Sequence, residues 1–391
     1  MAIWGSNKNM PKILLEFLNG KNCEADEILL PYNCKVVLAY CNGLKKKGIL
    51  TEEEFAGCSQ ALATLEKNSR MGKIKIGIEE EDSHTTIENH LIQMLGDTGK
   101  KIHIGKSRND EALCVLRLYC KEKLEETKDL VSNLIKVLEG ISLKHKDSPM
   151  PGYTHMKRAM PTTFSYWCNG ISNLFEKDLE ALEFAVGYID YCPLGTAAGF
   201  GSTIKLDWAQ IAIELGFSKL EENGYSAQNS RMKEGAFVCS VLLQAMMDVN
   251  KMATDLMLWN TEEFGFVKLS KDKTTGSSIM PHKKNPDVLE MLRASSGKVF
   301  GYQQQIVMIA NNLPSGYNKD HQEMKMPLIQ AFETSIISLE ALLLVLGGIE
   351  INKETMANAL SDEMGSAKRA ADLALGGKPF RDAYLSQKSP P

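Results

Sequence analysis

Long stretches of the chain carry apolar residues every three or four positions, the spacing that places them on one face of an α-helix. The stretch 110–146 contains a single glycine and no proline, and 229–264 has the same apolar spacing. Three further stretches, 163–191, 286–313 and 318–346, follow this pattern. The pattern predicts five helices of about 25–40 residues, well above the globular average of about 11–12.

Helices of this length have two structural consequences. Pro327 interrupts the stretch 318–346 and is expected to kink that helix, because proline removes a backbone hydrogen bond. At a rise of 1.5 Å per residue, the helices would be about 40–55 Å long. One chain cannot easily surround rods of that length, so exposed apolar stripes predict association into a larger bundle. A monomeric bundle is the alternative.

The regions on either side of the long helices carry shorter patterns. The first hundred residues contain shorter helical pieces, such as 50–65, where Thr51 is placed to cap the helix start. Glycine and proline separate short helices near the end of the chain. The chain is therefore predicted to be all-α. Its predicted domains are 1–106 (N-terminal, helical), 107–348 (long-helix bundle) and 349–391 (short, helical).

Composition and charge argue against several classes of protein. The net charge of −4 gives no basic surface for nucleic acid or for an anionic membrane. No run of eighteen apolar residues is present, so no membrane-spanning helix is expected, and residues 1–10 lack the pattern of a signal peptide. The nine cysteines have no metal-binding spacing and are expected to be free thiols in the core. These features together predict a cytoplasmic protein without a metal.

Polar residues gather in the segments that connect these helices, where functional residues usually lie on a rigid scaffold. In the segment 81–88, the simplest interpretation is a helix start with Ser83 as its cap and Glu88 in solvent. In 105–110, Ser107 and Asn109 with the backbone N–H groups of a helix start would bind an anion. The alternative there is simple capping by Asn109 or Asp110.

Three later segments carry candidate chemistry. His155, between turn residues and a helix start, suits proton transfer, although a lone histidine is more often structural. Gly276 and two serines suggest a mobile loop followed by lysines that would hold a carboxylate, and the alternative is a flexible polar linker. Gln322 and Lys325 are three residues apart, so both can point the same way from a helix. The alternative for this last pair is an ordinary solvated first turn.

Taken together, these segments resemble the argininosuccinate lyase branch of the aspartase/fumarase superfamily. Residues 276–286, GSSIMPHKKNP, are similar to the superfamily signature GSSxMPxKxNP. The branch is indicated by SRND at 107–110, PGYTH at 151–155, PLG at 193–195, and LP with YNKD within 313–320. The resemblance runs over nearly the whole chain. It implies three mostly helical domains, with the central helices of four subunits forming one core bundle.

The resemblance implies an anti elimination that splits argininosuccinate into arginine and fumarate, a reaction of arginine biosynthesis. Ser277 corresponds to the base that removes a proton from the carbon beside a carboxylate. Lys283 and Asn285 correspond to the groups that hold this carboxylate as it gains charge. His155 corresponds to the histidine that assists protonation of the leaving nitrogen, directly or through water. Thr154 corresponds to a carboxylate contact.

The remaining site residues implied by the resemblance bind the substrate. They are Ser107, Arg108, Asn109, Tyr317, Gln322 and Lys325, with Asp26 recognising the arginine-like end. Each active site would take residues from three chains of a homotetramer, with no metal or organic cofactor.

Some residues depart from the family pattern. Lys106 stands for an arginine, Lys157 and His282 stand for glutamines, and the chain ends soon after Tyr384, where relatives continue with a further subdomain. Two alternatives stay open: a lyase for another N-substituted aspartate such as adenylosuccinate, and a non-catalytic structural relative.

Overall fold

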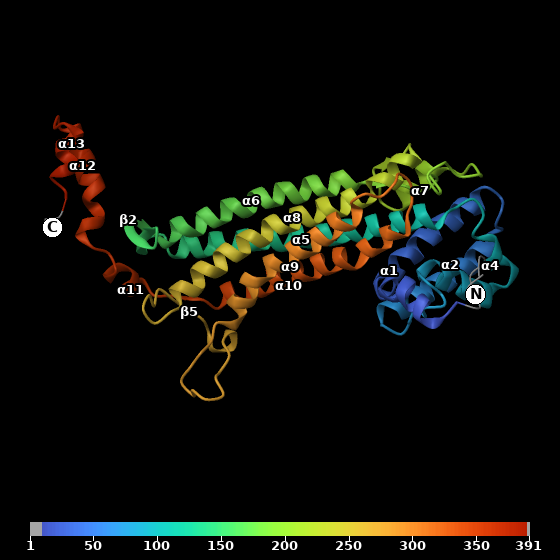
Figure 1. Cartoon of the computed structure of the whole chain (residues 1–391), viewed down its shortest axis with the longest axis horizontal. Helices are drawn as coiled ribbons and strands as arrows, with labels where there is room; N and C mark the ends of the chain where they lie inside the picture. The colour runs from blue at the N-terminus through green and yellow to red at the C-terminus, as the bar shows by residue number, and fades with distance from the viewer. Residues whose placement is uncertain (1–9, 389–391) are drawn as a thin grey trace. The chain divides into compact units, whose positions relative to one another are not determined.

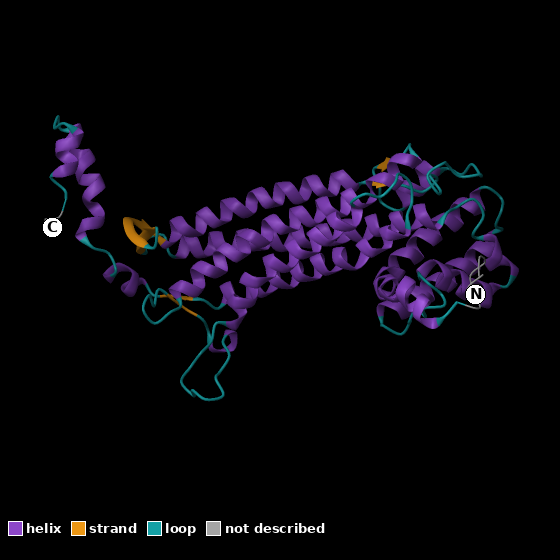
Figure 2. Cartoon of the chain, in the orientation of Figure 1, coloured by secondary structure: helices purple, strands orange, loops and turns teal. Residues whose placement is uncertain are grey.

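The computed structural model describes residues 10–388 and is built almost entirely from helices. This part of the chain contains thirteen α-helices and six strands, each of seven residues or fewer (Figure 2). The predicted all-α fold is therefore confirmed.

The five predicted long helices are present, with ends that differ from the predicted ones by several residues. Apolar spacing placed these helices correctly because each buries one face along its length. Their bounds are α5 Arg108–Lys144, α6 Phe164–Ile189, α8 Gly224–Trp259, α9 Asp287–Ala310 and α10 Lys325–Gly347.

The chain forms two compact units, and each long helix contributes to both. The first unit comprises Met1–Lys128, Ala181–Leu243 and Gly297–Ser335, and the second Asp129–Glu180, Gln244–Ser296 and Ile336–Pro391. Within each unit, parts of the long helices lie side by side (Figure 1). The domain boundaries near residues 106 and 348 stay a prediction.

The first unit begins with a helix that the sequence pattern did not predict. Helix α1 (Lys12–Lys46) is 35 residues long and contains Pro31, whereas only shorter helical pieces were expected here. Polar residues such as Asn22 and Asp26 are buried on it beside apolar ones, so the usual contrast between two faces is lost. Its apolar side packs with α2 (Glu52–Arg70) and α3 (Ser83–Leu95) in one core cluster. Helices α4 (Asp97–Lys101) and α7 (Trp208–Glu214) and strands β3 (Tyr191–Cys192) and β4 (Lys219–Leu220) complete this unit.

Helix caps explain where two of these helices begin. The predicted cap of α2 is confirmed: the Thr51 hydroxyl accepts the Glu54 N–H at 3.1 Å, and the Glu54 carboxylate accepts the Thr51 N–H at 2.9 Å. For α3 the predicted cap was wrong. Asp82 accepts the N–H of Thr85 at 2.9 Å, while Ser83 and Glu88 are buried rather than in solvent.

Pro327 does not kink α10. Residues Lys319–Met324 form a 3-10 turn, and the α-helix begins at Lys325, so the proline is the third helical residue. A proline in the first turn removes an N–H that would have no helical partner. The expected kink is therefore replaced by a helix start.

The second unit contains a β-hairpin that the sequence did not predict. Strands β1 (Pro149–Thr154) and β2 (Lys157–Thr163) pair antiparallel through the two-residue turn of His155 and Met156. Both turn residues have positive φ, +52° and +61°. Strands β5 (Val267–Lys268) and β6 (Glu350–Ile351) and helices α11 (Lys353–Asn358), α12 (Ser366–Leu375) and α13 (Phe380–Leu385) also belong to this unit.

Two further expectations from the sequence concern the cysteines and the membrane-spanning potential of the helices. All nine cysteines are buried free thiols, as predicted. One segment, Lys319–Gly347, is long and apolar enough to cross a membrane, which the expectation from apolar runs did not foresee. Half of its most apolar window is buried inside the structure, and buried core helices satisfy the same criterion.

Candidate active site

A cavity of about 150 Å³ in the first unit gathers most of the predicted substrate-binding residues. Arg108 and Asn109 reach it from the start of α5, and Tyr317, Gln322 and Lys325 from the segment that leads into α10. The cavity is completed by residues from α1, α3, α5, α8 and the segments before α3 and α10: Asn22, Glu81, Asp82, His84, Ala112, Arg231 and Lys319. Residues about 300 positions apart therefore meet at one site.

The same unit holds a larger cavity of about 660 Å³, but we assign the site to the smaller one. The larger cavity is lined by none of the predicted site residues. Charged residues around it are paired with each other or with neighbours, as Lys121 is with Asp190 and Lys35 with Glu122. Volume alone therefore does not decide the assignment.

Asp26 and Lys325 form a buried ion pair beside the cavity. The Lys325 ammonium lies 2.5 Å from the Asp26 carboxylate and 2.9 Å from the side-chain oxygen of Asn22. The backbone N–H and the hydroxyl of Ser83 donate to the other Asp26 oxygen at 3.0 and 3.1 Å. Burial alone would raise the pKa of Asp26, but Lys325 and nearby His84 lower it below its ordinary value. The Asp26 carboxylate is therefore ionised at neutral pH.

Two more ion pairs line the cavity. Lys319 lies 2.9 Å from Glu81, and Arg108 contacts Asp82 and lies 3.4 Å from Glu81. Burial of Glu81 works to raise its pKa, but Arg108 and Lys319 together bring it below its usual value. Glu81 has a φ of +74°, in the left-handed region, while its carbonyl accepts a hydrogen bond from Asn22 at 2.9 Å. This backbone conformation is therefore fixed by the surrounding contacts.

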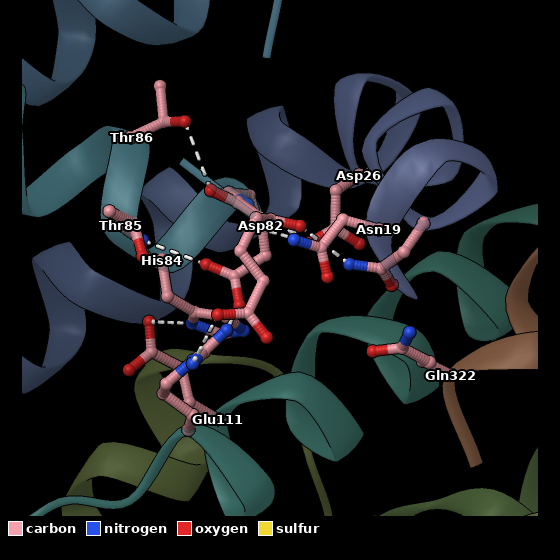
Figure 3. A network of polar contacts seen from close by, with 12 residues as sticks. Asn19, Asp26, Asp82, His84, Thr85, Thr86, Glu111 and Gln322 are labelled. Carbon is pink, nitrogen blue, oxygen red and sulfur yellow. Dashed lines mark hydrogen bonds and ion pairs between the residues drawn. The ribbon is translucent and has the colours of Figure 1, made fainter. Parts of the chain in front are cut away.

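The imidazole of His84 contacts the buried carboxylate of Glu111 (Figure 3). Its Nδ1 lies 2.8 Å from one oxygen of Glu111, and the ammonium of Lys106 lies 2.7 Å from the other. Burial of Glu111 opposes its ionisation, but Lys106 and His84 hold its pKa far below the ordinary range. Sequence reasoning did not select any of these three residues. The available signals were the presence of His84 in the polar segment 81–88 and of Lys106 in the polar segment 105–110.

Asp110 fixes the start of α5 and so positions Ser107, Arg108 and Asn109. Its carboxylate accepts the backbone N–H groups of Ser107, Glu111, Gly195 and Ala197 at 2.8–3.1 Å. The Ser107 hydroxyl accepts the N–H of Asn109 at 3.2 Å, so Ser107 and Asp110 together cap this helix start. Of the two caps in the simple capping alternative, Asp110 takes part.

The loop that meets Asp110 requires a glycine at position 195. Gly195 has a φ of +97°, and a Cβ added there would lie 2.7 Å from the ring of Trp208. Burial raises the pKa of Asp110 to about 6 despite its backbone hydrogen bonds.

Asp26, Asp82 and His84 have potential metal-ligand atoms within 4.8 Å of one another. Lys325 and Arg108 already neutralise the two carboxylates. A divalent cation would have to displace an ammonium and a guanidinium group. We therefore describe this group as part of an ion-pair network rather than as a metal site.

The remaining predicted residues lie in the second unit. Thr154 ends β1 and His155 begins the hairpin turn. Ser277, Lys283 and Asn285 lie on the loop between β5 and α9, whose base is closed by backbone hydrogen bonds of 2.9 and 3.1 Å between Thr275 and Asn285.

The conformation of this loop places two backbone N–H groups against the side-chain oxygen of Ser277. The Ser277 oxygen accepts the backbone N–H groups of Ile279 and Met280 at 3.3 and 3.1 Å. Asn285 donates to the carbonyl of Gly276 at 3.1 Å, and Lys283 is exposed. The structure thus brings most of the predicted binding residues together in the first unit. In the second unit, Thr154 and His155 lie on the hairpin, whereas Ser277, Lys283 and Asn285 lie on a separate loop.

Comparisons with known proteins identify the family of the chain. A family model described as Lyase matches residues 17–301. An argininosuccinate lyase of Thermotoga neapolitana is 37% identical over 382 residues, which cover 98% of this chain and 96% of the relative. One from Sorangium cellulosum is 34% identical over 384 residues, covering 98% of this chain and 89% of the relative. The chain belongs to the argininosuccinate lyase family.

Solved structures of two lyases have a similar fold. An EDDS lyase in complex with formate superimposes with a TM-score of 0.81 at 26% identity, covering 91% of this chain and 70% of that one. A fumarate lyase:delta crystallin from Brucella melitensis, bound to cobalt, has a TM-score of 0.77 at 19% identity, with coverages of 93% and 88%. At that identity the second likeness supports the fold alone. The predicted family resemblance is confirmed.

Proposed function

We propose that this member of the argininosuccinate lyase family cleaves the C–N bond of argininosuccinate to give arginine and fumarate. The observation that carries the proposal is the charged cavity of the first unit. It collects the predicted binding residues Arg108, Asn109, Tyr317, Gln322 and Lys325 and presents both signs of charge. Argininosuccinate itself has three carboxylates, an amino group and a guanidinium group. A cavity with charges of both signs is suited to such a molecule.

Ser277 is the proposed base of the elimination. It takes the proton from the carbon beside a carboxylate, and the electron pair left on that carbon forms the C=C bond of fumarate as the C–N bond breaks. A serine needs stabilisation of its alkoxide to act as a base. The N–H groups of Ile279 and Met280 that point to its oxygen supply part of that stabilisation.

Other loop and hairpin residues complete the proposed reaction. Lys283 and Asn285 hold the carboxylate that gains negative charge, and Thr154 contacts a carboxylate of the substrate. The departing nitrogen receives a proton with the help of His155. Backbone hydrogen bonds between Thr275 and Asn285 fix the two ends of the loop, so the segment between them can move.

The proposed assembly is a homotetramer that shares its active sites between chains. Large apolar side chains are exposed along the long helices, including Tyr166, Phe184, Phe300, Ile337 and Leu344, each at least 51% exposed. Such surfaces support association with further copies of the chain. We place the enzyme in the cytoplasm as part of arginine biosynthesis.

A substrate panel tests the proposed function. The purified protein is incubated with argininosuccinate, adenylosuccinate and N-(1,2-dicarboxyethyl) derivatives of amino acids other than arginine, all of them N-substituted aspartates, and fumarate is followed by its ultraviolet absorbance. We expect turnover with argininosuccinate and a kcat/KM at least about a hundredfold lower with the others, because they lack the arginine end. Light scattering in the same buffer should give the mass of four chains.

Two results of this panel would contradict the proposal. Preferred turnover of adenylosuccinate would make the chain a lyase for another N-substituted aspartate. Absence of fumarate from every compound, by a protein with the mass of a tetramer, would leave the structural role as the better account.

A further inference from the structure

Arg231 is a buried cation on the wall of the candidate active site. It lies on α8, lines the cavity of the first unit, and is 4% exposed. Within residues 10–388, it makes no ion pair with a carboxylate, and its Nε–H is buried without an acceptor. Burial lowers the pKa of Arg231 to about 10, so the guanidinium is still charged at neutral pH. A buried charge without a partner is costly, and it therefore points to a missing anion.

The other cations of the cavity already have anionic partners. Arg108 contacts Asp82 and Glu81, Lys319 pairs with Glu81, and Lys325 pairs with Asp26. An incoming carboxylate would have to break one of these pairs to bind there. At Arg231 it would meet a positive charge without breaking an ion pair.

The remaining contacts of Arg231 hold its guanidinium in place. One of its terminal nitrogens, Nη2, donates to the backbone carbonyl of Asn109 and, at 3.1 Å, to the side-chain oxygen of Gln228. Its guanidinium carbon lies 5.3 Å from the ring centre of Tyr317. Asn109 and Tyr317 are themselves predicted to bind the substrate. The guanidinium is thus preorganised next to two residues of the proposed site.

The sequence assigned no particular partner to one carboxylate of the proposed substrate, the α-carboxylate of the arginine half. The two carboxylates of the succinyl half are matched by Lys283, Asn285 and Thr154. For the arginine half, the sequence assigned Asp26 to recognise the arginine-like end, and an acid cannot bind a carboxylate. The predicted binding cations Arg108 and Lys325 are already paired with carboxylates, whereas Arg231 has no carboxylate partner among the described residues.

We propose that Arg231 binds the α-carboxylate of the arginine half of the substrate and so selects substrates that carry this group. This role rests on the proposed function and adds a specificity residue to it. A guanidinium binds a carboxylate through charge-assisted hydrogen bonds, and the free Nε–H is one donor available for them.

Calorimetric binding of L-arginine and agmatine to the full-length protein tests this role. Agmatine keeps the guanidinium and the amine but lacks the carboxylate. We expect the wild-type protein to bind L-arginine at least about tenfold more tightly than agmatine. In Arg231→Met, L-arginine binding should weaken by roughly ten- to a hundredfold, while agmatine binding changes by no more than about twofold. Arg231→Lys should lie between the two, because it keeps the charge without the planar fork.

Lys233→Met is the matched control, since it removes a positive charge from an exposed position of the same helix. It should leave both affinities unchanged. Fumarate binding is a second control, because the succinyl half has its own partners. In argininosuccinate turnover, Arg231→Met should raise KM more than it lowers kcat.

Three outcomes would overturn the role of Arg231. One is equal wild-type affinity for L-arginine and agmatine, and another is an unchanged preference in Arg231→Met. The third is equal weakening of L-arginine, agmatine and fumarate, which would show that Arg231 only supports Tyr317 and Asn109. If Arg231→Met fails to fold, Arg231→Gln is read in the same way. Failure of the wild-type protein to release fumarate from argininosuccinate would instead reject the proposed function, whatever the binding preference.

Discussion

At the scale of single residues, the candidate site is built from charges that neutralise one another. Asp26 with Lys325, and Glu81 with Lys319, form ion pairs of 2.5 and 2.9 Å, and Arg231 is left without a carboxylate among the described residues. Buried ion pairs contribute little net stability because desolvation offsets their attraction. Their value here is to hold donors and acceptors in fixed positions before the substrate binds.

Sequence reasoning found site residues in polar connecting segments, and the family resemblance added Asp26 inside α1, but His84, Glu111 and Arg231 were missed. His84, Glu111 and Arg231 occupy helical positions, where a polar residue normally indicates a solvated face. What makes them part of the site is burial and proximity to segments far away in the chain. Neither property can be read from the local pattern.

One residue-scale prediction concerns a buried acid outside the site. Burial and its hydrogen-bonded neighbour Asp248 raise the pKa of Asp178 to about 8. Because the folded-state pKa is above the ordinary 3.8, the protonated form favours folding, and its contribution is lost as pH rises from about 4 to 8. Asp178→Asn stays neutral throughout, so it should raise the melting temperature at pH 8 more than at pH 5.

Thermal unfolding followed by circular dichroism at both pH values checks this prediction. The exposed neighbour Glu176→Gln serves as the control and should give the same shift at both. A shift for Asp178→Asn that is no larger at pH 8 than at pH 5 would mean that Asp178 titrates normally.

At the scale of elements, the spacing of apolar residues predicted the five long helices. The two elements that it missed, α1 and the hairpin, have identifiable causes. Helix α1 was missed because it buries polar and apolar residues side by side. The hairpin was missed because prolines at 149, 151 and 161 and a glycine at 152 hide the alternation of a strand. The hairpin matters for function because its turn carries His155.

A prediction at this scale concerns the stability of the hairpin turn. Two consecutive residues with positive φ are typical of a type I′ turn, which favours glycine at the second position. Met156 occupies this position and is 70% exposed, so its side chain contributes little packing. Met156→Gly should stabilise the protein by about 0.5–1 kcal/mol, the relief of left-handed strain less the entropy of glycine.

Urea unfolding of Met156→Gly measures this effect. Fumarate release should be retained, because His155 and Thr154 are unchanged. The exposed Met247→Gly, in the interior of α8, is the opposite control and should destabilise by about 0.5–1 kcal/mol. Loss of stability in Met156→Gly would show that the turn is not strained.

At the scale of the whole molecule, the chain separates binding from chemistry. Most proposed binding residues lie in the first unit, whereas Ser277, Lys283 and His155 lie in the second with the carboxylate contacts Thr154 and Asn285. The family resemblance found in the sequence was confirmed by relatives that cover nearly the whole chain. The assembly that would bring complementary residues together from different copies is a proposal, because it depends on contacts between chains.

The central claim is that Ser277 removes the proton during the elimination, and its most direct test compares two neighbouring serines. Fumarate release from argininosuccinate is measured for wild type, Ser277→Ala and Ser278→Ala at equal protein concentration. We predict that Ser277→Ala lowers kcat by about 10²–10⁴-fold, whereas Ser278→Ala keeps it within about tenfold. Wild-type turnover in Ser277→Ala, with the fold intact by circular dichroism, would contradict the mechanism.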